Sequence, residues 1–342
     1  MGSAKLIWAN NLRALATIAV IVLHVASTIS SLYPAISKSY FLTSIFIDSS
    51  VRWGVPVFIM LSGSFALENY DNRLKSFFAK MFHRIVLPFL FWSVVYLFFF
   101  SWKELTDPAK SIGQLLAFTG NQFLSGTASH LWFVYVIVSM YLVFPFLSKW
   151  TKVATEKEYI YFFVLWLFFL LIDPYLSDYD INFSYNFFTG FIGYIVLGNY
   201  LFKTTRKFNQ LLLISLFLTG FLYTAIRTYF ASVEENEINE LFMDNLSLNV
   251  CVMSFCVYLI CRQRNYTLHS TWQRAVDIIC KYSYGIYLSH LLILNIFLRL
   301  GLKFDFLHPI ISIPLITVTC LVISCGLIMG MKKIPVLKKL AG

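Results

Sequence analysis

The sequence predicts an all-α integral membrane protein with about ten transmembrane helices and both termini in the cytoplasm. Of its 342 residues, 58% are hydrophobic and only 13% are charged, and the mean hydropathy is +0.71. This composition is not that of a soluble domain. Apolar runs long enough to cross a bilayer recur from one end of the chain to the other. The alternating pattern typical of membrane β-strands is absent from the sequence.

The apolar runs divide the chain into successive spans that form one polytopic domain, residues 1–342, without an appended soluble domain. No basic segment followed by a small-residue cleavage site precedes the first run, so this run is predicted to be a retained span. The spans are expected at 11–31, 43–66, 83–102, 130–148, 159–174, 186–202, 209–229, 246–261, 282–300 and 309–331.

The distribution of basic residues sets the orientation of these spans. With the N-terminus in the cytoplasm, 20 of the 27 Lys and Arg residues fall on the inner side. Topology therefore accounts for the net charge of +10, and no nucleic acid partner is expected. Two acidic outer loops, at 173–180 and 234–244, lack a calcium-loop pattern and are predicted to be solvated surface. No metal site is predicted.

Arg13 and His24 interrupt the otherwise apolar first span. Eleven residues at ~100° each bring the two side chains within about 20° of one another, roughly 16 Å apart along the axis. They share a face of the helix but differ in depth. An ionisable residue inside such a helix is costly and usually faces protein or a wet cavity, so His24 is a functional candidate. The alternative is a histidine that hydrogen-bonds a neighbouring helix.

The second span carries Arg52 several residues inside its apolar run, shortly before Pro56. A proline in a membrane helix frees a backbone carbonyl, so a kink beside a cavity is expected here. Arg52 either reaches outward as a structural anchor or binds an anionic group that arrives from outside. The sequence does not favour one role over the other.

The third span is predicted to open with Lys80 and Arg84, one helical turn apart at the cytoplasmic face, followed by a kink at Pro88. Two basic residues at an inner helix end are ordinary topology signals. Arg13 is also expected at the inner end of its span. The three together favour an alternative interpretation, a binding cluster for a cytoplasmic phosphate-bearing donor.

Two further spans carry residues suited to ligand binding or close packing. His130 and Trp132 stand at the predicted outer mouth of the fourth span. A tryptophan is common there as part of the aromatic belt, but an indole face beside a polar side chain also binds sugar rings. The sixth span contains Gly193 and Gly198, small residues that permit close contact between helices.

The ninth span repeats the pattern of the first. Ser283, Tyr287 and His290 follow one another at spacings of four and three, so they share one face. His290 lies at a depth comparable with that of His24, which predicts a shared polar centre. The alternative is a histidine that hydrogen-bonds a tyrosine for packing.

Six motifs together resemble the acyltransferase 3 family. They are the Arg-x10-His spacing of the first span, RWGVPVFIMLSG, a basic cluster running into RIVLP, HLWFVY, GYIVLGNYL and SYGIYLSH. The motifs appear in order over nearly the whole chain. Within the family, the chain is similar to the stand-alone bacterial O-acetyltransferases of surface glycans.

The resemblance implies transfer of an acyl group, expected to be acetyl, from cytoplasmic acetyl-CoA to a hydroxyl of an extracytoplasmic or lipid-linked glycan. It implies that Arg13 binds the donor and that His24 is catalytic. Arg84 matches the second arginine of the family's R-x-x-R pair, whereas Met81 replaces the first and Lys80 lies beside it. The expected location is the bacterial cytoplasmic membrane. The expected partners are acetyl-CoA, the glycan and membrane lipids, with no permanently bound cofactor.

Physical chemistry supports such a site. Arg13, Lys80 and Arg84 are suited to the phosphates of coenzyme A, and the pantetheine arm is about as long as the roughly 16 Å between Arg13 and His24. A buried imidazole is expected to be neutral at pH 7 and able to accept a proton. The alternative function is an exporter or flippase for a glycan or lipid-linked sugar. A transporter typically shows repeated halves with broken helices, and the sequence has no such symmetry.

Overall fold

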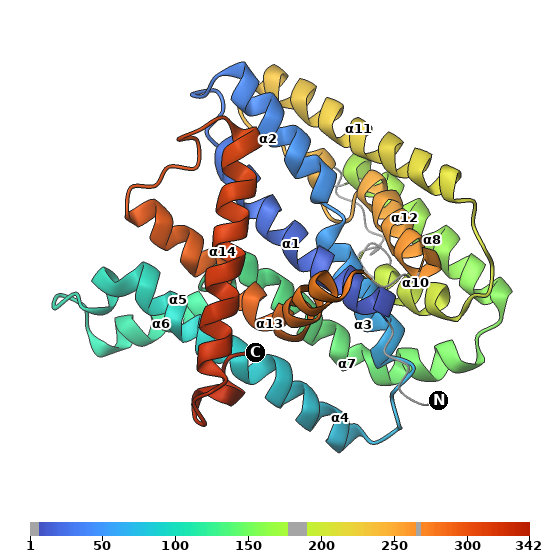
Figure 1. Cartoon of the computed structure of the whole chain (residues 1–342). Helices are drawn as coiled ribbons and strands as arrows, with labels where there is room; N and C mark the ends of the chain where they lie inside the picture. Colours follow the sequence, from blue (N-terminus) through green and yellow to red (C-terminus); the bar gives the residue numbers. More distant parts are fainter. Residues whose placement is uncertain (1–6, 177–189, 265–267) are drawn as a thin grey trace.

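The computed structural model describes residues 7–176, 190–264 and 268–342, without the side chains of 173–176, as helices and short connections (Figure 1). No strand occurs within these ranges. The α-helices are α1 Ile7–Ser30, α2 Lys38–Val51, α3 Gly54–Ala66, α4 Leu74–Met81, α5 Leu87–Leu105, α6 Ile112–Ser125, α7 Trp132–Val153, α8 Glu156–Leu176, α10 Ile192–Lys203, α11 Gln210–Glu235, α12 Leu248–Arg264, α13 Ser270–Arg299 and α14 Pro309–Met331. A π-helical segment, Phe82–Val86, and three short 3-10 turns, Ser129–Leu131, Leu241–Met243 and Leu337–Lys339, complete the described secondary structure.

The structure confirms an all-α integral membrane protein. Seven helical segments of the described chain are long and apolar enough to cross a membrane: Ile7–Ser30, Lys38–Ala66, Leu74–Leu105, Ser129–Val153, Gln210–Glu235, Leu241–Arg264 and Pro309–Met331. The other three predicted spans correspond to α8, α10 and α13. The count of ten therefore stays a prediction. Two predicted features lie partly outside the described residues. They are the sixth predicted span, at residues 186–189, and the first acidic loop, at Asp178 and Asp180.

The second span is broken one turn before Pro56, where a proline kink is expected. The helix ends at Val51 and a new helix starts at Gly54, so the break lies at Arg52 and Trp53. Pro56 falls in the first turn of α3. Pro56 has no N–H to offer the carbonyl of Arg52, so the helical bond is lost at the position of the break.

The third span begins earlier than predicted. Helix α4 starts at Leu74, so Lys80 and Arg84 do not open the helix. The helix widens into the π-helical segment Phe82–Val86 immediately before Pro88. Pro88 has no N–H to offer the carbonyl of Arg84, and a wider turn is one way a helix accommodates that loss.

Helix α6 occupies residues that the sequence predicts as part of a loop near 103–129. It starts with a capping box, in which the Ser111 hydroxyl accepts the backbone N–H of Gln114 and the Gln114 side chain accepts that of Ser111. The S-x-x-Q pattern was a readable start signal. The helix is short and amphipathic, so its sequence contains no apolar run long enough to be predicted as a span.

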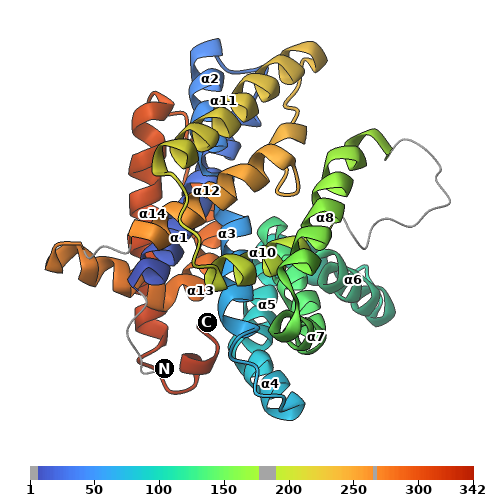
Figure 2. The ribbon, with the colours of Figure 1, turned by 90° about the vertical axis from the view of Figure 1, so that its right-hand side faces the viewer.

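Helix α1 lies at the centre of the bundle. It packs against α2, α3, α12, α13 and α14, and Figure 2 shows α14 on one side of it and α7 and α8 on the other. Helices α3 and α10 also approach closely, as the small residues predict. A Cβ at Gly63 would lie 2.1 Å from the carbonyl oxygen of Ile195, and one at Gly198 would lie 2.0 Å from that of Met60. Only glycine fits at this crossing.

Candidate functional site

A cavity of about 840 Å³ opens among α1, α3, α7, α13, the segment from α4 to α5, and the chain after α14. Among the described residues, its lining carries seven Lys and Arg side chains and a single acidic side chain, that of Asp71. The seven cations are Arg13, Lys80, Arg84, Lys281, Lys332, Lys338 and Lys339. A cavity with this charge attracts a ligand that carries several negative charges.

The structure brings together the three basic residues predicted to bind a donor. Arg13 comes from α1, Lys80 from α4 and Arg84 from the π-helical segment, and all three line the cavity. The Arg13 guanidinium lies 4.0 Å from the sulfur of Cys280 on α13, which places it between α1 and α13. Ser283 also lines the cavity, at the level of α13 just beyond Cys280.

Three histidines from three separate elements meet in the bundle. The ring of His24 on α1 lies 5.1 Å from that of His290 on α13 and 6.3 Å from that of His130, between centroids. The rings of His130 and His290 are 5.1 Å apart. The polar centre expected from His24 and His290 is therefore present, and it contains a third member.

Ring nitrogens of this cluster lack partners. The Nδ1 atom of His290 lies 2.6 Å from the carbonyl oxygen of Tyr287, and since a carbonyl only accepts, this nitrogen carries the hydrogen. Its Nε2 is then an acceptor, and it has no hydrogen-bond partner among the described residues. The ring of His130 approaches the backbone of Leu288, but neither of its nitrogens makes a hydrogen bond of good geometry within the same ranges. Such buried polar atoms are uncommon, and a polar group of a substrate would satisfy them.

The prediction that His130 stands at the outer interface is wrong. Its side chain is buried, with 2% of the residue exposed, because the 3-10 turn Ser129–Leu131 folds it inward before α7 starts. Trp132 remains at the surface with 39% exposed, and its ring lies 5.7 Å from that of Phe191. The two residues therefore do not form the joint sugar platform that their spacing suggested.

Tyr287 separates the cationic cavity from the histidines. Its ring lines the cavity with that of Phe133, 5.4 Å away, and lies 5.4 Å from the ring of His130 on the other side. The Tyr287 hydroxyl donates to the backbone carbonyl of His130. His24 is not among the described residues that line the cavity. Tyr287 thus contacts both the cationic cavity and the histidine cluster.

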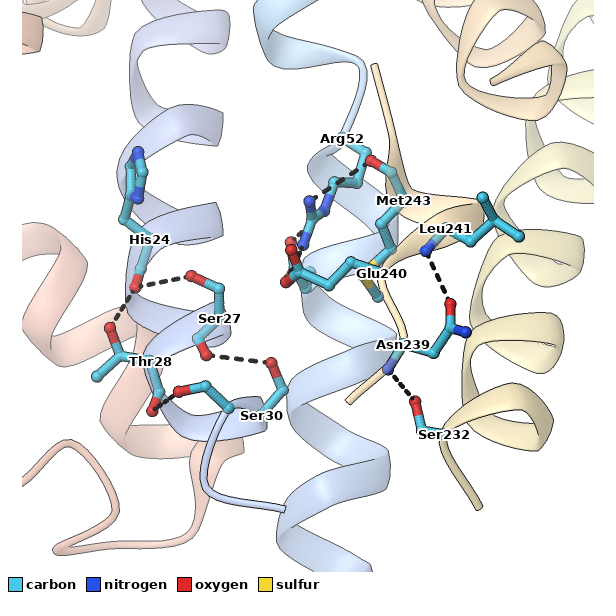
Figure 3. Close-up of polar contacts among 12 residues, drawn as sticks. His24, Ser27, Thr28, Ser30, Arg52, Ser232, Asn239, Glu240, Leu241 and Met243 are labelled. Carbon is cyan, nitrogen blue, oxygen red and sulfur yellow. Dashed lines mark hydrogen bonds and ion pairs between the residues drawn. The ribbon is translucent and has the colours of Figure 1, made fainter. Parts of the chain in front are cut away.

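Arg52 is held by carboxylates and a backbone carbonyl. Its Nε donates to Asp48 at 2.8 Å and its Nη2 to the other oxygen of Asp48 at 2.5 Å. Nη1 lies 3.4 Å from the Met243 carbonyl oxygen, and Nη2 lies 3.4 Å from Glu240. Figure 3 shows these contacts together with His24 on α1. This arrangement matches the anchoring role. Asp48, fully buried, was readable from the sequence as an acid four residues before Arg52.

Four lysines complete the lining of the cavity. The sequence predicts them only as charges of the cytoplasmic side: Lys281, Lys332, Lys338 and Lys339. Partial burial lowers the pKa of Lys332 below its usual value, and the positive charges of Lys281 and Lys338 lower it further. No group of three or more His, Cys, Asp or Glu side chains in the described chain is placed to hold a metal ion.

Comparison with known proteins identifies one family. A family model for an acyltransferase domain matches residues 6–329, nearly the whole chain. The match includes the first span with Arg13 and His24 and ends within α14, before Lys332. No curated protein and no solved structure matches the chain.

Proposed function

Because the chain belongs to the acyltransferase 3 family, we propose that it transfers an acetyl group from cytoplasmic acetyl-CoA to a hydroxyl of an extracytoplasmic or lipid-linked glycan in the bacterial cytoplasmic membrane. The observation that carries this proposal is the cavity with seven cations beside a buried cluster of three histidines. Purified protein supplied with radiolabelled acetyl-CoA is expected to bind it and to hydrolyse it slowly. A protein that neither binds nor hydrolyses acetyl-CoA would exclude the proposal and favour an exporter.

The donor fits the charge and position of the cavity. Coenzyme A carries a diphosphate and a separate phosphate monoester, and charge-assisted hydrogen bonds from Lys and Arg are the strongest contacts such groups make. Arg13, Lys80 and Arg84 supply three of these cations. The pantetheine arm would then extend from Arg13 along α1 toward His24.

We propose that His24 acts as the general base. It accepts the proton of the acceptor hydroxyl, and the oxygen of that hydroxyl attacks the thioester carbonyl. The carbon–sulfur bond then breaks, and the proton passes from the imidazolium to the leaving thiolate. Alternatively His24 attacks first and carries a transient acetyl group. The base mechanism needs only one ternary complex, and the unpartnered nitrogens of His130 and His290 support it because they can bind the acceptor hydroxyl.

Tyr287 must move for the donor to reach His24. The thioester in the cavity meets the rings of Tyr287 and Phe133 before it meets the histidines. The Tyr287 hydroxyl is held by only one hydrogen bond in the described structure, to the carbonyl of His130. A rotation that breaks this bond opens the path and frees the His130 carbonyl at the same time.

Replacing Arg84 with alanine is expected to weaken acetyl-CoA binding by ~1.5–3 kcal/mol, the value of one charge-assisted hydrogen bond. Calorimetric titration of the purified protein measures this loss. Arg73→Ala is the matched control, since Arg73 is exposed in the same part of the chain, pairs with Asp71 at 3.8 Å and does not line the cavity. Unchanged donor affinity in Arg13→Ala, Lys80→Ala and Arg84→Ala alike would reduce these cations to topology signals.

Both termini are expected in the cytoplasm, because the basic residues lie mainly on that side and the number of predicted spans is even. A cysteine introduced at Lys207 should then react only from the cytoplasmic side, and one at Glu237 only from outside. Both positions are exposed. An impermeant maleimide is applied to intact and to opened cells. The labelling of each variant is measured above that of the protein without the introduced cysteine. Equal labelling of the two positions in intact cells would contradict this topology.

A further inference from the structure

The chain after α14 packs against the bundle at the mouth of the cavity. The segment turns through Leu337–Lys339 and returns to α13, where Ala341 is fully buried. A Cβ at Gly285 would lie 2.5 Å from the carbonyl oxygen of Ala341, so the segment lies directly on the α13 backbone. This close contact fixes the position of the lysines that the segment carries.

Four lysines, here called the C-terminal lysine group, line the cavity at this place: Lys332, Lys338 and Lys339 follow α14, and Lys281 belongs to α13. None of them forms an ion pair within the described parts of the chain. They are close enough that the charges of Lys281 and Lys338 lower the pKa of Lys332. Like charges held together without a counter-charge destabilise the ligand-free protein, and a bound anion relieves their repulsion.

The one acidic side chain in the described lining forms no ion pair with the group. Asp71 is the one acidic side chain among the described residues of the lining, and it lies 3.8 Å from Arg73. Arg13, Lys80 and Arg84 add three further cations to the same cavity from other elements. The total positive charge exceeds what a single diphosphate would neutralise. A second phosphate group of the same ligand would neutralise part of the remainder.

We infer that the C-terminal lysine group binds the 3′-phosphate of the nucleotide end of the donor, whereas Arg13, Lys80 and Arg84 bind its diphosphate. This inference rests on the proposed function. Lysine ammonium groups are compact, mobile point charges suited to surrounding a phosphate monoester dianion, which has no fixed planar geometry to match. The enzyme would thereby select coenzyme A thioesters over acyl carriers that lack a 3′-phosphate.

The test compares two donors on matched variants. Wild-type protein in neutral detergent is titrated with coenzyme A and with 3′-dephospho-coenzyme A, and is expected to bind the first roughly ten- to a hundredfold more tightly. The triple variant Lys332→Ala, Lys338→Ala, Lys339→Ala keeps only Lys281 of the group. It should lose most of the preference and bind coenzyme A almost as weakly as wild-type protein binds the dephosphorylated ligand. Lys333→Ala is the control, because Lys333 is exposed beside Lys332 and does not line the cavity. It should keep the wild-type ratio.

A second triple variant replaces the same lysines with arginine: Lys332→Arg, Lys338→Arg, Lys339→Arg. It retains the charges and should keep the preference for coenzyme A over the dephosphorylated ligand. The comparison distinguishes an effect of charge from an effect of altered packing of the segment. An unchanged ratio in the alanine triple variant, or an equal loss of affinity for both ligands, would overturn the inference. The inference would also be overturned if phosphatidylglycerol micelles displaced coenzyme A and abolished the difference in affinity between the two ligands. The C-terminal lysine group would then bind lipid headgroups. Failure of wild-type protein to bind either ligand would instead contradict the proposed function.

Discussion

Replacing His24 with alanine is expected to lower the rate of acyl transfer about 10²- to 10⁴-fold, the usual effect of losing a general base. The residue shares a helix with Arg13 of the cationic cavity, and its ring lies 5.1 Å from that of His290. Its loss removes the proton acceptor and leaves the cations in place. Donor affinity should therefore change little. Transfer of labelled acetyl to the surface glycan in vesicles measures the rate, and calorimetry measures donor binding.

His269→Ala serves as the control for this substitution, because His269 is exposed before α13 and outside the cluster. His290→Ala should retain measurable activity if that side chain only orients the others. A folded His24→Ala protein with near wild-type transfer would remove the central residue of the proposed mechanism. Trapping of a labelled acetyl-histidine at position 24 would convert the base into a nucleophile.

Much of the fold was readable from the sequence because hydrophobic runs in membrane helices are long and uniform. The last span was predicted at 309–331, the bounds that α14 has in the structure. Pro56 predicted a kink in the second span, and the break lies one turn before it, at Arg52 and Trp53. The π-helical segment Phe82–Val86 was not predicted, because hydropathy does not distinguish a π-helical turn from an α-helical one.

The site was readable where a residue violates the hydrophobic pattern. His24 and His290 stand out as ionisable residues inside apolar runs, and helical geometry alone gave their similar depth. His130 lies at the end of a run, where a polar residue is ordinary, so only the 3-10 turn that folds it inward reveals its place. The C-terminal lysine group looks like topology signal in the sequence. Its position depends on a return of the chain to Gly285 that no periodicity encodes.

The buried ion pair of Arg52 and Asp48 offers the clearest separation of a structural from a binding role. Both side chains are buried, with 7% of Arg52 and none of Asp48 exposed, and both carboxylate oxygens of Asp48 accept from the guanidinium. An ion pair of this kind neutralises the arginine that the sequence offers as an anion receptor. Removing Asp48 leaves the buried arginine with only the half-exposed Glu240 as counter-charge, whereas removing both members leaves no buried charge.

Asp48→Ala is therefore expected to lower the free energy of unfolding by about 3–5 kcal/mol, and the double variant Asp48→Leu, Arg52→Met by much less. Denaturant titration in mixed micelles compares the two, with Glu240→Gln as a milder control because Glu240 is exposed and lies 3.4 Å from Arg52. If Arg52 only anchors α2, the folded double variant should transfer acetyl at close to the wild-type rate. A stable double variant that binds the donor normally but no longer acetylates its glycan would instead show that Arg52 contacts the acceptor, and the anchoring role would be wrong.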